Sequence, residues 1–216
     1  MAEISWLGHG CCRIKAREAT IVTDPYSKRL GFDFGKPRAD IVTVSRPGEG
    51  YGYVEAVKGE PKVLMGPGEY EISDVFITGI GTYSEDKASK HRGKNTAYVF
   101  ELEGMVMCHL GAIGQPPTAE QREQMSNIDV LFVPVGGHTT IDAAQASEVI
   151  SMIEPHIVIP IHYRTDILDL DLDGLEKFAK EMGISDLTPQ EKLTLRSSDL
   201  PEGTKVVILD YKNQYK

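Results

Sequence analysis

Several short stretches of this chain are apolar at nearly every consecutive position, and they restrict the folds that it can adopt. Residues 40–44, 130–135 and 157–161 are the clearest examples. Runs of this length suit strands that are covered on both faces, as in a parallel sheet with further layers packed against it. None approaches the roughly 18 to 20 residues that a membrane-spanning helix needs. The chain is therefore predicted to fold around buried strands and not to cross a membrane.

The remaining pattern adds strands in the first half of the chain and helices in the second. Glu103-Gly104 is a tight-turn signal between two apolar runs and predicts a hairpin. Thr118 and Gln121 have the spacing of a capping box and predict the start of a helix. Further helices are predicted over residues 140–153 and 171–182, the second ending at Gly183. The other predicted strands span residues 4–7, 12–15, 20–23, 62–65, 75–78, 97–102, 105–109 and 205–209. This order indicates an α/β (or α+β) fold in one domain, residues 1–216.

Charge and cysteine content narrow the classes of partner and compartment. The chain has 23 Lys and Arg against 32 Asp and Glu, a formal net charge of −9. Such a chain repels a phosphate backbone, so no nucleic-acid partner is expected. The three cysteines are odd in number and two of them are adjacent, which argues against a disulfide framework and favours a cytoplasmic protein. A homo-oligomer is compatible with the sequence, although nothing in it specifies one.

Polar segments follow three of the predicted buried strands, where loops commonly present functional groups. These segments lie within residues 107–115, 133–142 and 157–163. His109 and His162 each come directly after an apolar run. Two histidines in the same position relative to neighbouring strands indicate a site at one edge of the sheet.

The chain resembles the metallo-β-lactamase superfamily, and in particular its branch of Zn-dependent hydrolases that includes the L-ascorbate-6-phosphate lactonase-like proteins. The resemblance rests on residues 6–10, 23–26, 92–101, 131–146 and 153–163. It implies a four-layer αββα sandwich whose active site lies at the edge of the sandwich. In such proteins two Zn²⁺ ions activate a bridging water for hydrolysis, held by a His-x-His-x-Asp-His loop, a later His, an Asp and a last His.

The loop in which the first four ligands belong has a different composition here. It reads Arg46-Pro47-Gly48-Glu49-Gly50-Tyr51, so the ligand positions hold Arg46, Gly48, Gly50 and Tyr51. The resemblance also places Ala112 where the family has its later Asp. Only His109 and His162 remain at positions that the family uses for metal, and two imidazoles are fewer than the three protein ligands of a catalytic zinc site. These departures predict a degenerate metal site.

We therefore expect a binding or interaction module without a cofactor, in which a small anionic ligand takes the place of the metals. Arg46 supplies the positive charge in this hypothesis. A simpler alternative is that Arg46 is a solvated loop residue or pairs with Glu49. The other residues expected to surround the ligand are Tyr51, His9, Lys94 and His138.

Two enzymatic alternatives stay open. The first is a hydrolase with a single Zn or Mn ion held by His109 and His162, to which His9 or Asp24 could add a donor; Asp24, before Pro25, is more simply a turn cap. The second is a metal-free enzyme in which His109 or His162 is a general base, with Tyr51 or a nearby serine as its partner.

Overall fold

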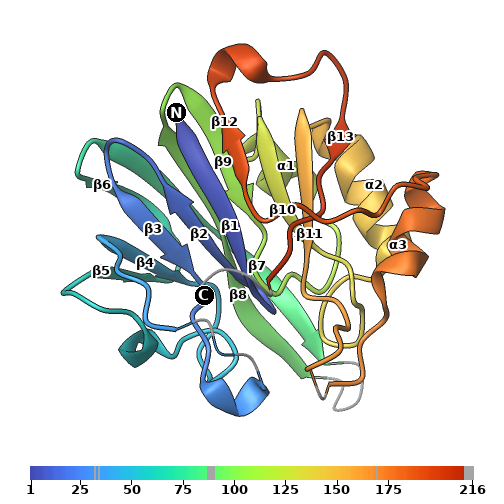
Figure 1. Ribbon diagram of the computed structural model, residues 1–216, viewed down its shortest axis with the longest axis horizontal. Coiled ribbons are helices and arrows are strands. Elements are labelled where there is room, and N and C mark those ends of the chain that lie inside the picture. Colours follow the sequence, from blue (N-terminus) through green and yellow to red (C-terminus); the bar gives the residue numbers. More distant parts are fainter. Residues whose placement is uncertain (32, 34, 87–90, 169, 212–216) are drawn as a thin grey trace.

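The computed structural model describes residues 1–31, 33, 35–86, 91–168 and 170–211. Two mixed β-sheets face each other, with helices α2 and α3 beside β11 and β13 on one side of the sandwich (Figure 1). The strand order is β12-β1-β2-β3-β4-β5 in the first sheet and β13-β11-β10-β9-β8-β7-β6 in the second. The mixed α/β class predicted from the sequence is confirmed.

The six-stranded sheet is antiparallel at its β12 side and parallel at its β5 side. β12 pairs antiparallel with β1, as β1 does with β2 and β2 with β3, whereas β3, β4 and β5 run parallel. Its strands are β1 (Ala2–Gly8), β2 (Cys11–Lys15), β3 (Thr20–Thr23), β4 (Ile41–Val44), β5 (Lys62–Met65) and β12 (Leu193–Leu195).

The seven-stranded sheet shows the same division. β6 to β9 form an antiparallel meander, and β9, β10, β11 and β13 are parallel. Its strands are β6 (Gly68–Ile72), β7 (Val75–Asp86), β8 (His91–Leu102), β9 (Met105–His109), β10 (Val130–Pro134), β11 (Ile157–Ile161) and β13 (Lys205–Val206). Each sheet therefore has parallel strands whose carboxyl ends can carry a site.

The helices begin at capping signals that the sequence carries. The capping box of Thr118 and Gln121 opens α1 (Ala119–Glu123) as predicted. A second capping box, Asp142 with Gln145, starts α2 (Ala143–Ile153) three residues later than the predicted start at 140. α3 (Leu175–Met182) also starts later than predicted, at 175 instead of 171, and ends at Gly183 in the left-handed conformation. The 3₁₀ turns are η1 (Lys28–Leu30), η2 (Val54–Ala56) and η3 (Ser197–Asp199).

Alternating side chains of the six-stranded sheet serve two apolar clusters. Ile21 and Ile41 join the large cluster that includes Tyr98 and Phe132 of the opposite sheet, and this cluster extends to Ala146 of α2 and Phe178 of α3. Their chain neighbours Val22 and Val42 point to the other face. There they pack with residues from η2 and the loop before α3. The outer layer on this side is thus built from 3₁₀ turns and loops, while the predicted helical layer lies beside the seven-stranded sheet (Figure 1).

Several strand boundaries differ from the predicted ones for tertiary reasons. β7 extends beyond its predicted end to Asp86, and β8 begins before its predicted start, at His91. These extensions form because the two strands pair with each other there. A single strand is predicted over residues 205–209, but only Lys205–Val206 forms it. In the described part of the chain, no helix is long and apolar enough to cross a membrane.

Candidate functional site

A pocket of about 690 Å³ opens where loops from both sheets meet. Arg46 and Tyr51 come from the loop after β4, His138 from the loop after β10, and His162 directly after β11. His9 reaches the same pocket from the turn between β1 and β2. Five of the seven residues proposed from the sequence are therefore brought together. Their part in binding a ligand stays a prediction.

Four residues of this region have a left-handed backbone. The φ angles are +51° for His9, +43° for Asp24, +60° for His138 and +52° for His162. They are four of the nine described non-glycine residues with positive φ. This conformation is unfavourable for residues with a Cβ and is often found at functional sites. His9, Asp24 and His162 each follow directly after the last residue of a strand, β1, β3 and β11 respectively.

Tyr51, His162 and His9 form a compact cluster in the pocket wall. The Tyr51 hydroxyl lies 2.8 Å from Nε2 of His162, and the other ring nitrogen of His162 lies 3.5 Å from the Thr140 hydroxyl. The ring of His9 is 4.4 Å from that of His162 and 5.0 Å from that of Tyr51, measured between centroids. Both nitrogens of His162 thus already have polar neighbours.

Burial keeps this cluster uncharged. Desolvation lowers the pKa of His162 to about 4, and it lowers the pKa of His9 well below its ordinary value, with His162 adding to the effect. Desolvation also raises the pKa of Tyr51, so its hydroxyl keeps its proton. At neutral pH the three side chains are hydrogen-bonding groups without charge. Nδ1 of His9 is buried and has no hydrogen-bond partner among the described residues.

Arg46 brings the positive charge to this cluster. Its guanidinium carbon lies 5.4 Å from the centre of the Tyr51 ring, in the arrangement of a cation–π contact. The alternative that Arg46 pairs with Glu49 is wrong, because Glu49 accepts a hydrogen bond of 2.8 Å from Arg29 instead. Among the residues that the structure describes, no carboxylate forms an ion pair with Arg46.

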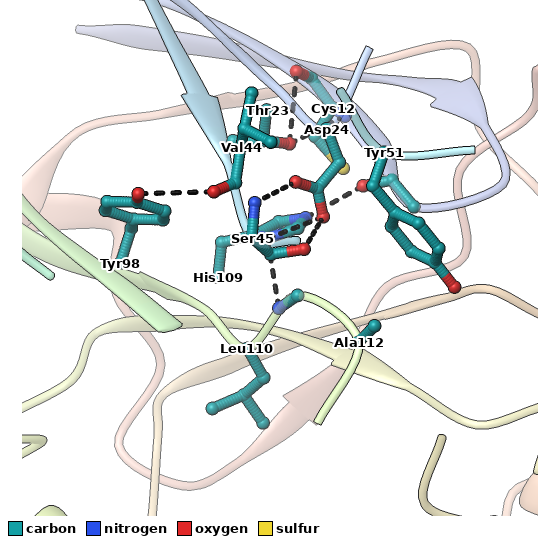
Figure 2. Close-up of polar contacts among 12 residues, drawn as sticks. Cys12, Thr23, Asp24, Val44, Ser45, Tyr51, Tyr98, His109, Leu110 and Ala112 are labelled. Carbon is teal, nitrogen blue, oxygen red and sulfur yellow. Dashed lines mark hydrogen bonds and ion pairs between the residues drawn. The ribbon is translucent and has the colours of Figure 1, made fainter. Parts of the chain in front are cut away.

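Asp24, directly after β3, is hydrogen-bonded to Ser45, directly after β4 (Figure 2). Its carboxylate accepts hydrogen bonds of 2.7 Å from the backbone N–H and from the hydroxyl of Ser45, and lies 4.0 Å from Nδ1 of His109. Burial raises its pKa to about 7, although the hydrogen bonds from Ser45 and the charge of Arg46 act in the opposite direction. The interpretation of Asp24 as a local turn cap is therefore wrong.

His109 and Lys94 lie outside the pocket. His109 is buried with no exposed surface; its Nε2 donates to the Gly10 carbonyl at 2.8 Å, while Nδ1 accepts from the Gly111 N–H at 3.2 Å. Desolvation lowers its pKa to about 4. Lys94 is exposed and lines a separate groove.

The side chains present do not fit the dinuclear metal centre that the fold implies. Within the described ranges, no three or more His, Cys, Asp and Glu side chains are grouped so as to hold a metal ion. His109 would have to break one of two backbone hydrogen bonds before it could bind a metal. Arg46 also adds a permanent positive charge to the pocket, which opposes the binding of a dication.

Sequence reasoning missed several residues of the pocket wall. Asp142, Asp173 and Lys177 also line it. The capping-box spacing of Asp142 and Gln145 is a signal that would have placed Asp142 at the helix start, next to the site. Asp173 and Lys177 are four residues apart and form an ion pair of 2.6 Å.

Comparisons with known proteins identify the family and the fold. Residues 3–162 match the family model described as a β-lactamase superfamily domain. A Thermotoga maritima crystal structure, assigned to the Zn-dependent hydrolases of the metallo-β-lactamase superfamily, is 35% identical, with a TM-score of 0.80 over 97% of this chain and 98% of that one. A UPF0173 metal-dependent hydrolase of Saccharolobus solfataricus is 26% identical over 90% of this chain and its own full length. A metallo hydrolase of Ignicoccus hospitalis, 17% identical over 90% of this chain and 98% of its own, shares the fold with a TM-score of 0.60.

Proposed function

The chain belongs to the β-lactamase superfamily, and we propose that it binds a small organic anion in the pocket lined by Arg46, Tyr51 and His162. The observation that carries the proposal is Arg46. Arg46 lines the pocket, its guanidinium lies over the Tyr51 ring, and it pairs with no carboxylate of a described residue. A partly buried cation of this kind favours a carboxylate or phosphate group, which its planar fork can bind through two hydrogen bonds.

The neighbours of Arg46 favour anion binding because none of these three side chains carries a negative charge that would neutralise the guanidinium. Tyr51, His9 and His162 are uncharged at neutral pH, since burial lowers the pKa of both histidines and raises that of the tyrosine. They offer hydrogen bonds and an aromatic surface. The unpartnered Nδ1 of His9 marks a hydrogen-bonding capacity that the described part of the folded chain leaves unused.

The acidic residues of the pocket already have partners of their own. Asp173 pairs with Lys177 at 2.6 Å, and Asp171 lies 3.5 Å from Nδ1 of His138. Asp142 caps α2 by accepting from the Gln145 N–H. These carboxylates can accept further hydrogen bonds from hydroxyl groups. We therefore favour a small hydroxylated acid or phosphate ester, for which a pocket of about 690 Å³ is large enough.

Isothermal titration calorimetry with inorganic phosphate and with gluconate, in buffer containing EDTA, tests the proposal. We expect binding that EDTA does not change and that Arg46→Ala weakens by about tenfold or more, because a charge-assisted hydrogen bond is lost. Arg29→Ala is the matched control, since Arg29 is exposed and paired with Glu49 in the same region. Equal affinity of the Arg46 and Arg29 variants, or no binding of either anion at millimolar concentration, contradicts the proposal.

A second candidate is metal-dependent hydrolysis at a reduced site. It is favoured by the names of the relatives and by the closeness of two pocket imidazoles, His9 and His162, whose ring centres are 4.4 Å apart. In this case His162→Ala should reduce the amount of zinc or manganese that co-purifies with the protein, and EDTA should lower the Tm of the wild type. In the anion-binding account neither change occurs.

A further inference from the structure

A second groove adjoins the Arg46 loop, and apart from Arg46 it shares no described lining residue with the larger pocket. Its volume is about 440 Å³. It is bounded by the end of β4, the turn between β5 and β6, and the paired strands β7 and β8. We call it the β5–β8 groove. Arg46 stands in the wall that the groove shares with the larger pocket, because it lines both.

The charged side chains of the β5–β8 groove are all cationic. Arg46 and Lys94 line it, and no aspartate or glutamate is found among its described lining residues. Lys94 is exposed and, within the described part of the chain, forms no ion pair. With two cations and no carboxylate among its described lining residues, this groove is locally positive on a chain whose net charge is −9. This arrangement favours an anionic group.

The rest of the groove is apolar and open. Tyr83 sits directly opposite Lys94 in the β7–β8 ladder, so the two side chains share one face of the sheet. Tyr83 is 48% exposed and Met65 is 57% exposed, which is unusual for large apolar side chains that lie around one groove together with Pro67. Methionine and tyrosine are well suited to contact an apolar ligand of adaptable shape.

A glycine keeps the space between these residues open. Gly81 lines the groove, and a Cβ atom at this position would lie 3.6 Å from Pro67 Cγ. That distance is ordinary contact, and Gly81 is not at a positive φ. A larger side chain at position 81 would therefore fill the groove without forcing the backbone out of its conformation.

We propose that the β5–β8 groove binds a small amphipathic organic acid. Arg46 and Lys94 hold the acidic group, and the hydrocarbon or aryl body lies against Met65, Pro67 and Tyr83. The two-part lining argues for this class of ligand, since a purely polar anion would leave the apolar part in water and a neutral apolar molecule would leave both cations unused. The two proposals share Arg46, whereas Lys94 lines only the β5–β8 groove and Lys177 only the larger pocket.

Titration calorimetry with octanoate, and with 1-octanol as the neutral probe, tests this assignment. We expect octanoate to bind about tenfold or more tightly than octanol, since only octanoate can form charge-assisted hydrogen bonds. Lys94→Met should remove most of this preference. Lys62→Met, the same change at an exposed position of β5 outside the groove, is the matched control.

Two further variants distinguish binding in the β5–β8 groove from binding in the larger pocket. Gly81→Leu should abolish octanoate binding by filling the groove while keeping both cations. Lys177→Met alters only the larger pocket and should leave octanoate binding unchanged. The inference is overturned if octanoate and octanol bind alike, if Lys94→Met behaves as Lys62→Met does, or if Lys177→Met abolishes binding. It is also overturned if sedimentation shows a dimer that Tyr83→Ser dissociates, because a second copy then covers the groove.

Discussion

Replacing Asp24 by asparagine should change how the stability of this protein depends on pH. The Asp24 carboxyl is 1% exposed, and its pKa is raised from 3.8 to about 7, first of all by burial. Between these two pH values the folded state holds a proton that the unfolded state has lost. The free energy of unfolding therefore falls as pH rises through this window.

The size of the effect follows from the pKa difference. A shift of roughly three units, at about 1.4 kcal/mol each, corresponds to about 4 kcal/mol of stability lost between pH 4 and pH 8. Asparagine has nearly the same shape, can accept one hydrogen bond from Ser45 and can donate to the Ser45 hydroxyl. The stability of Asp24→Asn relative to the wild type should thus increase by about this amount over the same range.

Urea unfolding of both proteins at several pH values from 4 to 8 measures this difference directly. Taking the difference removes the opposite contribution of the buried histidines, which both proteins share. Asp40→Asn is the control, because Asp40 also accepts a backbone hydrogen bond, from Thr20, but is exposed. A difference between Asp24→Asn and the wild type that stays flat from pH 4 to pH 8 would refute the reasoning.

Three further predictions concern the same region. Tyr51→Phe removes the hydroxyl bonded to Nε2 of His162 and should lower the free energy of unfolding by about 1–3 kcal/mol, measured in urea, whereas an unchanged midpoint would contradict that bond. Burial lowers the pKa values of His109 and His162 to about 4, so both imidazoles stay neutral in the folded state down to about pH 5. The free energy of unfolding should therefore decrease as pH falls from 6.5 towards 4. NMR titration midpoints near 6.5 would be inconsistent with the burial of these histidines. Gly111→Ala places a Cβ against the Cβ of Ser45 at a φ of +61° and should lower the free energy of unfolding by more than about 2 kcal/mol. A Tm equal to that of the wild type would show that the loops after β4 and β9 are not in contact.

The fold could be predicted where local signals and burial agree. Strands predicted over residues 62–65, 105–109 and 157–161 have the bounds that the structure shows. The capping box of Thr118 and Gln121 is likewise visible in the sequence. By contrast, β6 is a half-exposed edge strand with little apolar periodicity, so only its pairing with β7 reveals it. The same is true of the long ends of β7 and β8, which are strands because they pair with each other.

The sequence indicates part of the pocket lining but not the contacts within it. Of the two histidines that directly follow apolar runs, His162 lines the pocket and His109 does not. Nothing in the sequence could show that both nitrogens of His109 are used by Gly10 and Gly111. Nor could it show that Glu49 accepts a hydrogen bond from Arg29 and forms no ion pair with Arg46. Such contacts depend on how loops from different strands pack, and local sequence does not encode them.

The metal content of the protein tests the central claim most directly. The protein should be purified without a histidine tag, dialysed against zinc or manganese and then against metal-free buffer, and measured by elemental mass spectrometry. If Arg46 has replaced the first metal ligand in function as well as in position, each chain retains less than about a tenth of an equivalent of either metal. Close to one equivalent that survives dialysis would contradict the account and establish a metal site in this pocket.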